Sequence, residues 1–170
     1  MKIGFIGLGA MGRPMASNLL SAGYEVHAFD VVEAAVKEME GKGAIGHPSA
    51  GEMAGHVDVI ICSLPNAKIV EGTMCGENGV FENCKEGTVI IDMSSVAPNS
   101  TKAMAKKAGA KGIHYIDAPV SGGVSGAAAG TLTIMVGADD ETFNKVKPIF
   151  DVLGKNIYHV GEVGGGDAIK

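Results

Sequence analysis

Short apolar segments recur along this chain and alternate with longer segments that have the spacing of amphipathic helices. Two of the apolar segments, VDVIICSL (57–64) and TVIIDMS (88–94), are apolar on successive residues rather than on alternate ones. Strands of this composition are buried on both faces, as they are in parallel sheets covered by crossover helices. We therefore predict an α/β fold with a doubly wound, mainly parallel sheet and helices on both faces.

The expected boundaries follow the apolar periodicity and the glycines and prolines that interrupt it. Strands are expected at 2–7, 25–30, 44–45, 57–64, 88–94, 114–120, 131–137 and 156–161. Helices are expected at 11–23, 31–43, 49–55, 66–74, 98–112 and 139–154. No linker interrupts this alternation, so residues 1–170 are predicted to form one domain.

Charge and cysteine content argue against several classes of protein. The net charge is −5 and the pI is about 5.5, so the chain lacks the basic surface that binds nucleic acid or an anionic membrane. No segment reaches the roughly 18 apolar residues that cross a bilayer. The thiols Cys62, Cys75 and Cys84 form no C-x-x-C pair, and the histidines are scattered. We therefore expect a cytoplasmic protein with reduced thiols, Cys62 in its core and no metal site.

The first predicted strand runs into the pattern G-x-G-x-x-G. Alone this pattern is a weak signal, but here it follows a strand, opens a helix and is followed by an acidic residue, Asp30, at the end of the next strand. That context defines a dinucleotide-binding fingerprint of the Rossmann fold, with the pyrophosphate at the helix N-terminus. An ordinary glycine turn is the alternative. The predicted cofactor contacts are Gly7, Leu8, Gly9, Ala10, Met11 and Gly12.

Asp30 bears on the choice between NAD and NADP. A carboxylate at this position would accept hydrogen bonds from the ribose hydroxyls and repel a 2′-phosphate, and Val31 and Val32 supply no arginine to receive one. We therefore predict NAD as the cofactor in preference to NADP, with Asp30 and Val31 in contact with it. A role for Asp30 as a helix N-cap is compatible with this one.

Two later loops are expected at the same edge of the sheet. Leu64, Pro65 and Asn66 follow one buried strand, and Ser94 and Ser95 follow the next. In the Rossmann geometry both loops line the dinucleotide cleft, so Leu64, Pro65, Asn66 and Ser95 are candidate cofactor contacts. For the two serines, capping of the helix that starts near Pro98 is an equally supported alternative.

Five motifs in order give the chain a wider resemblance. GFIGLGAMGRPMASNL, SLPNAKIV, DMSSVAPNSTK, DAPVSGGVSGAAAGTLTIMVG and HVGEVGGGDAIK together resemble the β-hydroxyacid dehydrogenase family, which includes 3-hydroxyisobutyrate and 2-(hydroxymethyl)glutarate dehydrogenases. The resemblance covers the whole chain. It implies an NAD-dependent oxidoreductase that interconverts a small β-hydroxyacid and its semialdehyde by hydride transfer.

The resemblance also implies roles for two groups of residues. Ser121, Gly122 and Gly123 would bind the substrate carboxylate, since glycines let an anion lie against main-chain N–H groups. Residues 126–130 would form a tight loop beside the nicotinamide. From the residues alone, a flexible Gly/Ala loop without a ligand is an open alternative. Lys170, which ends a G-x-G-x-x-x-K pattern, would be the catalytic general acid/base.

The chain departs from the family pattern after Lys170. The family continues with an asparagine pair, a long helix and an all-helical C-terminal domain, and these are absent from the sequence. We therefore expect an isolated cofactor-binding domain that binds dinucleotide weakly, turns over little or not at all, and exposes an apolar face. Lys170 is expected to be mobile and badly placed, whereas the full-length parent would be a homo-oligomer.

Two other functions remain open from the sequence. A dinucleotide sensor or scaffold could share this fold without catalysis, but it would not need Ser121–Gly123 and Lys170 together. A domain like that of 6-phosphogluconate dehydrogenase is the second alternative. A sugar phosphate would call for additional basic residues, and 117–130 contains none.

Overall fold

A computed structural model describes all residues, Met1–Lys170, and contains one mixed sheet. Its strands are β1 (Lys2–Ile6), β2 (Glu25–Phe29), β3 (Ile45–Gly46), β4 (Val59–Cys62), β5 (Val89–Asp92), β6 (His114–Asp117), β7 (Val120–Ser121), β8 (Leu132–Gly137) and β9 (Gly154–Gly161). Its helices are α1 (Gly12–Ser21), α2 (Glu33–Gly41), α3 (Ala50–Ala54), α4 (Ala67–Cys75), α5 (Val80–Asn83), α6 (Pro98–Gly109), α7 (Gly123–Ala129), α8 (Asp140–Leu153) and α9 (Gly165–Ile169). None of these helices has the length and apolar content to span a membrane.

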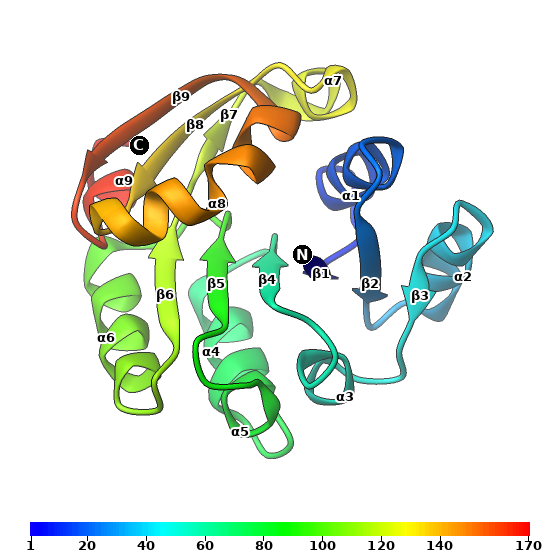
Figure 1. The fold of residues 1–170 in the computed structure, drawn as a ribbon, viewed down its shortest axis with the longest axis horizontal. Helices are drawn as coiled ribbons and strands as arrows, with labels where there is room; N and C mark the ends of the chain where they lie inside the picture. The colour runs from blue at the N-terminus through cyan, green and yellow to red at the C-terminus, as the bar shows by residue number, and fades with distance from the viewer.

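The first six strands form the parallel part of the sheet, in the order β3-β2-β1-β4-β5-β6 (Figure 1). The chain starts at β1, builds outward to β3, and then returns to the other side of β1 with β4. The predicted doubly wound, mainly parallel fold is confirmed. Loops that follow β1 and β4 therefore lie side by side at the carboxyl ends of the strands, where ligands bind in folds of this kind.

Successive residues of the central strands point into two separate cores. On one face Ile61 and Ile91 pack with apolar side chains of α1, α2 and α8. On the other face Ile60, Cys62 and Ile90 pack with α3, α4, α5 and α6. The burial of both faces explains why β4 and β5 are apolar on every residue. Cys62 lies in the core, as predicted.

The later strands extend the sheet differently. β8 is antiparallel to β6 and β7 and parallel to β9, and Figure 1 shows these strands gathered beside α8, away from β3. The single strand expected at 114–120 is in fact two strands. β6 ends at Asp117, and Pro119, which has no N–H to donate, separates it from β7.

Residues 123–129 form a helix, so the expected loop at 126–130 is wrong for most of its length. The alanines of α7 pack against α1, where the Asn18 side chain donates to the Ala127 carbonyl at 2.9 Å. Helix α7 ends at Gly130, whose φ of +69° disfavours other residues. The short helices α5 and α9 were not expected either, because they have too few residues to show a helical period.

Candidate functional site

The glycine turn between β1 and α1 depends on close backbone packing. Gly7 has a φ of +97°, and a Cβ there would lie 2.2 Å from the Ser63 carbonyl oxygen of the neighbouring β4 loop. A Cβ on Gly12 would lie 1.8 Å from the carbonyl oxygen of Gly7. By contrast, a Cβ on Gly9 would meet nothing within 4 Å, so this glycine faces open space. The turn is therefore closely packed against the protein at Gly7 and Gly12 and open to solvent at Gly9, as an approaching phosphate requires.

The N-terminus of α1 faces the same space. Its N-cap residue, Met11, makes no side-chain capping hydrogen bond, and its first turn carries no acidic residue. Its N–H groups therefore have no side-chain acceptor and can bind an anion. Together with Gly9, this end of α1 fits the pyrophosphate of a dinucleotide cofactor.

Asp30 is tied to the glycine turn. Its carboxylate accepts one hydrogen bond from the Leu8 N–H at 2.7 Å and another from the Val32 N–H at 2.8 Å. Helix α2 starts at Glu33 with Val32 as its N-cap residue, so Asp30 is not the N-cap. A carboxylate has about four acceptor positions, so these two bonds leave capacity for ribose hydroxyls.

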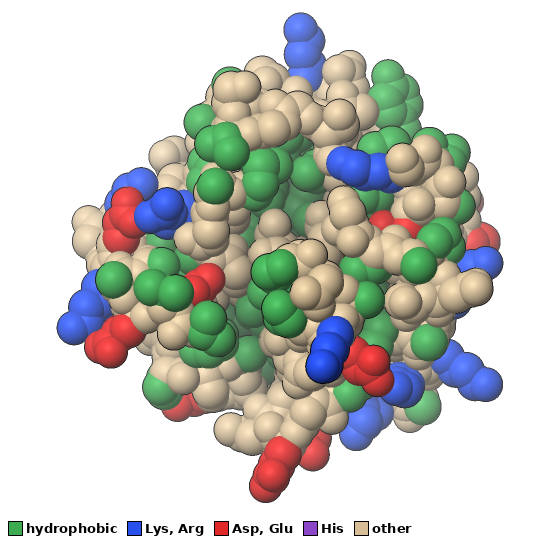
Figure 2. Space-filling view, turned by 180° about the vertical axis from the view of Figure 1, so that it is seen from behind, with side chains coloured by type: hydrophobic (Ala, Val, Ile, Leu, Met, Phe, Trp, Pro, Cys, Tyr) green, Lys and Arg blue, Asp and Glu red, His purple; other side chains and the backbone are tan.

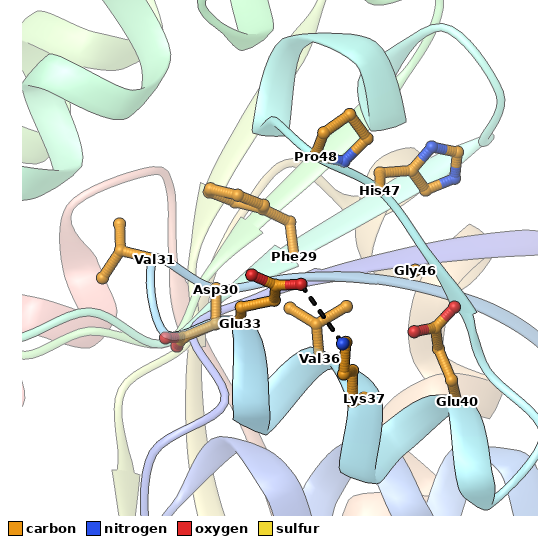
Figure 3. A pocket seen from close by; sticks show the side chains of 10 residues that line it. All are labelled: Phe29, Asp30, Val31, Glu33, Val36, Lys37, Glu40, Gly46, His47 and Pro48. Atoms are coloured by element: carbon orange, nitrogen blue, oxygen red, sulfur yellow. Dashed lines mark ion pairs between the residues drawn. The ribbon is translucent and has the colours of Figure 1, made fainter.

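Asp30 and Val31 also line a pocket of about 680 Å³ between α2 and the segment after β3 (Figure 3). Its charged side chains are three carboxylates, Asp30, Glu33 and Glu40, and one lysine, Lys37. Figure 3 shows Lys37 paired with Glu33, at 3.4 Å. The pocket is therefore acidic, with its one lysine already engaged. We call it the acidic pocket.

His47, on the far wall of the acidic pocket, is part of a histidine cluster. His47 Nε2 lies 2.8 Å from His27 Nδ1, and the rings of His27, His47 and His56 stack with centroids 5.0 to 6.1 Å apart. Burial lowers the pKa of His47, and the neighbouring His27 adds to this shift. Three of the five histidines, although scattered in the sequence, thus lie together, because the fold brings β2, β3 and α3 together.

A second pocket, of about 470 Å³, lies at the carboxyl ends of the strands. We call it the switch-point pocket, because the loops that follow β1 and β4 meet there. Its lining joins eight predicted site residues to four others: Met11, Ser63, Leu64, Pro65, Met93, Ser94, Ser95, Val120, Ser121, Gly122, Gly123 and Lys170. On the reverse side of the view in Figure 1, the hollowed central part carries hydrophobic side chains, and most charged ones lie toward the rim (Figure 2).

Ser121, Gly122 and Gly123 form one exposed wall of the switch-point pocket. Ser121 ends β7, and Gly122, with a φ of +134°, is the N-cap residue of α7. The chain therefore turns from strand to helix at these two exposed glycines, which have no side chains of their own.

Lys170, which follows α9, also lines this pocket. Its ammonium group donates a hydrogen bond to the Val120 carbonyl, and its backbone N–H donates to the Gly166 carbonyl at 3.1 Å. The structure thus places the Lys170 side chain at the pocket, whereas its expected mobility and poor catalytic placement stay predictions. The short helix α9 and the end of β6 direct its side chain into the pocket.

Ser94 and Ser95 differ in position. Ser94 is 3% exposed, and its hydroxyl accepts a hydrogen bond from the Leu64 N–H at 2.9 Å. Ser95 is exposed in the switch-point pocket. Helix α6 has Ala97 as its N-cap residue with no side-chain bond, so the capping alternative for the two serines is wrong. Ser94 therefore joins the loop after β5 to the loop after β4.

Of the candidates in the loops after β4 and β5, Asn66 alone lies outside both pockets. Its side-chain oxygen accepts a hydrogen bond from the Ile69 N–H at 3.0 Å, so Asn66 is the N-cap of α4. Pro65 precedes this cap, and the helix expected at 66–74 spans Ala67–Cys75. A cofactor contact of Asn66 therefore stays a prediction from the Rossmann geometry.

Three buried carboxylates lie behind the switch-point pocket, and sequence reasoning did not single them out. Asp92 and Asp117 end β5 and β6, and Asp167 lies in α9. Burial raises the pKa of Asp117 and raises that of Asp167 to about 6, and the Coulomb repulsion of the other carboxylates adds to both shifts. An aspartate that ends an apolar strand was the available signal for the first two.

Comparison with known proteins agrees with this geometry. A model of the family described as the NAD binding domain of 6-phosphogluconate dehydrogenase matches residues 2–161. The chain is 58% identical, over all its residues and 56% of the relative, to 2-(hydroxymethyl)glutarate dehydrogenase of Eubacterium barkeri. It is 44% identical, over 99% of the chain and 57% of the relative, to NAD-dependent L-serine dehydrogenase of Pseudomonas aeruginosa.

A solved structure matches the fold closely. This is the 3-hydroxyisobutyrate dehydrogenase of Mycobacterium tuberculosis with L-serine, which aligns with a TM-score of 0.94 and 36% identity. The match covers 99% of this chain and 57% of that protein. The chain thus spans a little over half the length of the relatives it matches.

Proposed function

The chain belongs to the family described as the NAD binding domain of 6-phosphogluconate dehydrogenase, and from this membership we propose the chemistry of its two pockets. Within that family, the chain is the NAD(P)-binding domain of a β-hydroxyacid dehydrogenase. The protein would interconvert a small β-hydroxyacid and the corresponding semialdehyde. The relatives whose names specify dehydrogenation of 2-(hydroxymethyl)glutarate and L-serine support this substrate class.

We assign the cofactor to the two pockets from the residues that fit it. Gly9 and the open N-terminus of α1 would hold the pyrophosphate. Asp30 and Val31 would contact the adenosine ribose in the acidic pocket, and Met11, Leu64, Pro65 and Ser95 would surround the nicotinamide. When bound, the nicotinamide ring supplies a hydride acceptor or donor.

NAD is the proposed cofactor in preference to NADP. A 2′-phosphate beside Asp30 would enter a pocket with three carboxylates and one lysine, and Glu33 already pairs with that lysine. The nearby carboxylates would repel the phosphate and raise the free energy of the bound NADP, whereas the ribose hydroxyls of NAD can donate hydrogen bonds to Asp30.

The substrate would lie across the switch-point pocket. The Ser121 hydroxyl and the N–H groups of Gly122 and Gly123 would bind its carboxylate. The Lys170 amine would accept the proton of the substrate hydroxyl during oxidation, as the carbon–hydrogen bond gives up its hydride, and would return that proton during reduction. Lys170 as an ammonium group would also stabilise the negative charge that develops on the oxygen.

The single observation that carries this proposal is the shared pocket of Ser121–Gly123 and Lys170. These residues are distant in sequence, and a domain that only binds dinucleotide has no need to bring them together at the end of β1.

Calorimetric titration tests the cofactor part of the proposal. NADH and NADPH are titrated into the wild-type protein and into Asp30→Ala. We expect tighter binding of NADH to the wild type, and loss of that preference in the variant, because the ribose then loses its acceptor and the 2′-phosphate its repulsion. Equal binding of both nucleotides by the wild type would contradict the assignment of Asp30.

A further inference from the structure

Helix α9 is held at both ends by one short segment, Asp117–Val120. At its start, the Asp117 carboxylate accepts hydrogen bonds from the Gly164 N–H at 2.7 Å and from the Asp167 N–H at 2.8 Å. At its end, the Val120 carbonyl accepts the hydrogen bond of the Lys170 ammonium group. A five-residue helix has too few internal bonds to be stable alone, so these outside contacts determine where it lies.

The Asp117 carboxylate is buried and closely packed between two glycines. Asp117 is fully buried, and a Cβ on Gly137 of β8 would lie 2.4 Å from its Oδ1. A Cβ on Gly166 would lie 3.0 Å from its Oδ2 and 2.3 Å from the Met135 carbonyl oxygen. Glycines on both sides thus allow α9 to approach the end of β6, and the carboxylate satisfies N–H groups that the helix itself leaves free.

A second contact joins α9 to α6. The Thr101 hydroxyl donates to Asp167 Oδ2, and Asp167 Oδ1, also buried, has no partner. This contact restricts the rotation of α9 about the Asp117 bonds. It cannot replace them, because it involves one side chain in the middle of the helix.

We propose that Asp117 is the positioning residue for Lys170: by binding the first turn of α9 it sets the place of the Lys170 amine beside Ser121–Gly123. Asp117 lines neither pocket, so it acts through α9 and not on the substrate. This inference rests on the proposed function, which makes the Lys170 amine the proton acceptor. Displacement of the amine would lower the rate of proton transfer sharply, because misplacement by about 1 Å can lower a rate about a hundredfold.

The test uses Asp117→Asn, an isosteric change that leaves one acceptor oxygen for two N–H donors. Its matched control is Asp139→Asn, which alters the carboxylate that caps α8 through the Thr142 N–H at 2.8 Å. Amide hydrogen exchange is measured for α9 and for the sheet. Acylation of the Lys170 amine is measured across pH 6 to 9 as a ratio to Lys155, an exposed lysine on β9.

In Asp117→Asn we expect amides of α9 to exchange about tenfold faster, the change that loss of one hydrogen bond to a charged group produces, with the sheet unchanged. Across the pH range, we also expect the ratio of Lys170 acylation to Lys155 acylation to differ from that of the wild type by about threefold or more. The reason is that an amine released from the Val120 carbonyl is freely solvated. Asp139→Asn should change neither quantity. Unchanged α9 exchange in folded Asp117→Asn, or equal acceleration in α9 and the sheet, would overturn the proposal.

If Asp117→Asn does not fold, Gly166→Ala provides the second variant, because its methyl group displaces α9 while Asp117 remains. In the wild type, the amide protons of Gly164 and Asp167 should be protected and shifted downfield by the carboxylate. If these two amides exchange as fast as unprotected amides, the proposal is overturned without any variant. Activity of Lys170→Ala tests the proposed function separately, so either hypothesis can fail alone.

Discussion

Gly9 and Gly12 show how two identical residues in one turn can have different physical roles. Gly12 is required by packing, since a Cβ there would lie 1.8 Å from the Gly7 carbonyl oxygen. Gly9 has no such neighbour, so the protein itself does not need a glycine there. The difference separates the stability of the turn from its proposed use as a phosphate site.

Alanine at each position tests this separation. Gly12→Ala should lower the free energy of unfolding by about 1–3 kcal/mol, as overpacking of a closed site does. Gly9→Ala should change stability by less than about 0.5 kcal/mol, as surface substitutions do, and weaken NADH binding about tenfold or more by filling the open space. Chemical denaturation and calorimetry measure both. Wild-type affinity for NADH in Gly9→Ala would argue against a phosphate at this turn.

Asp167 makes stability depend on pH. Its pKa is raised from 3.8 to about 6, mainly by burial. Folding therefore favours the protonated form: the stabilisation is fully present below pH 3.8 and is lost as the pH rises through about 6. Asp167→Asn should be more stable than the wild type at pH 7 by about 1–3 kcal/mol, because a buried unpaired oxygen no longer carries charge. It should show no such gain below pH 4.

Denaturation at several pH values measures this difference. Asp140→Asn, which changes an aspartate whose side chain is 95% exposed, is the control and should follow the wild-type profile. A constant difference between Asp167→Asn and the wild type from pH 4 to pH 8 would contradict the assigned titration.

At the scale of secondary-structure elements, the histidine cluster joins β2, the segment after β3 and the segment after α3. The His27 ring is bound on one side by Glu25 and on the other by His47, both at 2.8 Å. Glu52 of α3 lies 3.7 Å from the other nitrogen of His47. These contacts hold the far wall of the acidic pocket together while His47 is neutral.

Low pH should destabilise the contacts among β2, the segment after β3 and the segment after α3. The pKa of His47 is lowered from 6.5, so the fold favours the neutral ring, and stability should fall as the pH drops below 6.5. In His47→Gln this loss should be smaller, because the amide can still hydrogen-bond but cannot be protonated. The free energy of unfolding between pH 7 and pH 5 measures the effect, with Asp167→Asn as background so that the opposite trend of that residue is removed. If the free energy of unfolding falls equally with pH in the proteins with His47 and with Gln at this position, the assigned role of His47 is wrong.

At the scale of the whole molecule, two exposed apolar residues are next in sequence to residues that line the switch-point pocket. Val124 follows Gly123 and is 51% exposed, and Ile169 precedes Lys170 and is 61% exposed. The relatives are longer than this chain, which spans 52–58% of the length of three of them.

A hydrophobic dye should bind here if the expected apolar face includes Val124 and Ile169. We expect fluorescence enhancement of 8-anilinonaphthalene-1-sulfonate with the folded protein, and a smaller enhancement in the double variant Val124→Ser with Ile169→Ser. Val31→Ser, which changes a 90% exposed valine in the lining of the acidic pocket, is the control for a single exposed side chain. A strictly monomeric protein that binds no dye would contradict an apolar docking face.

The residues of this chain determined the class of fold, because burial on both faces of β4 and β5 requires apolar residues in succession, and that pattern is local. They also determined the glycine turn and Asp30, which lie within one β-α-β unit and carry their own context. The resemblance to a family supplied Ser121–Gly123 and Lys170 as candidates, and the fold brings them into one pocket.

The tertiary structure decided what depends on distant partners. Helices α7 and α9 are too short to show a period, and they form because α1, β6 and α6 bind them from outside. The position of Lys170 depends on Asp117 and Val120, which precede it by about fifty residues along the chain. The histidine cluster likewise exists only after β2 and β3 pair. Such contacts have no local signal, since their free energy comes from groups that meet only in the folded chain.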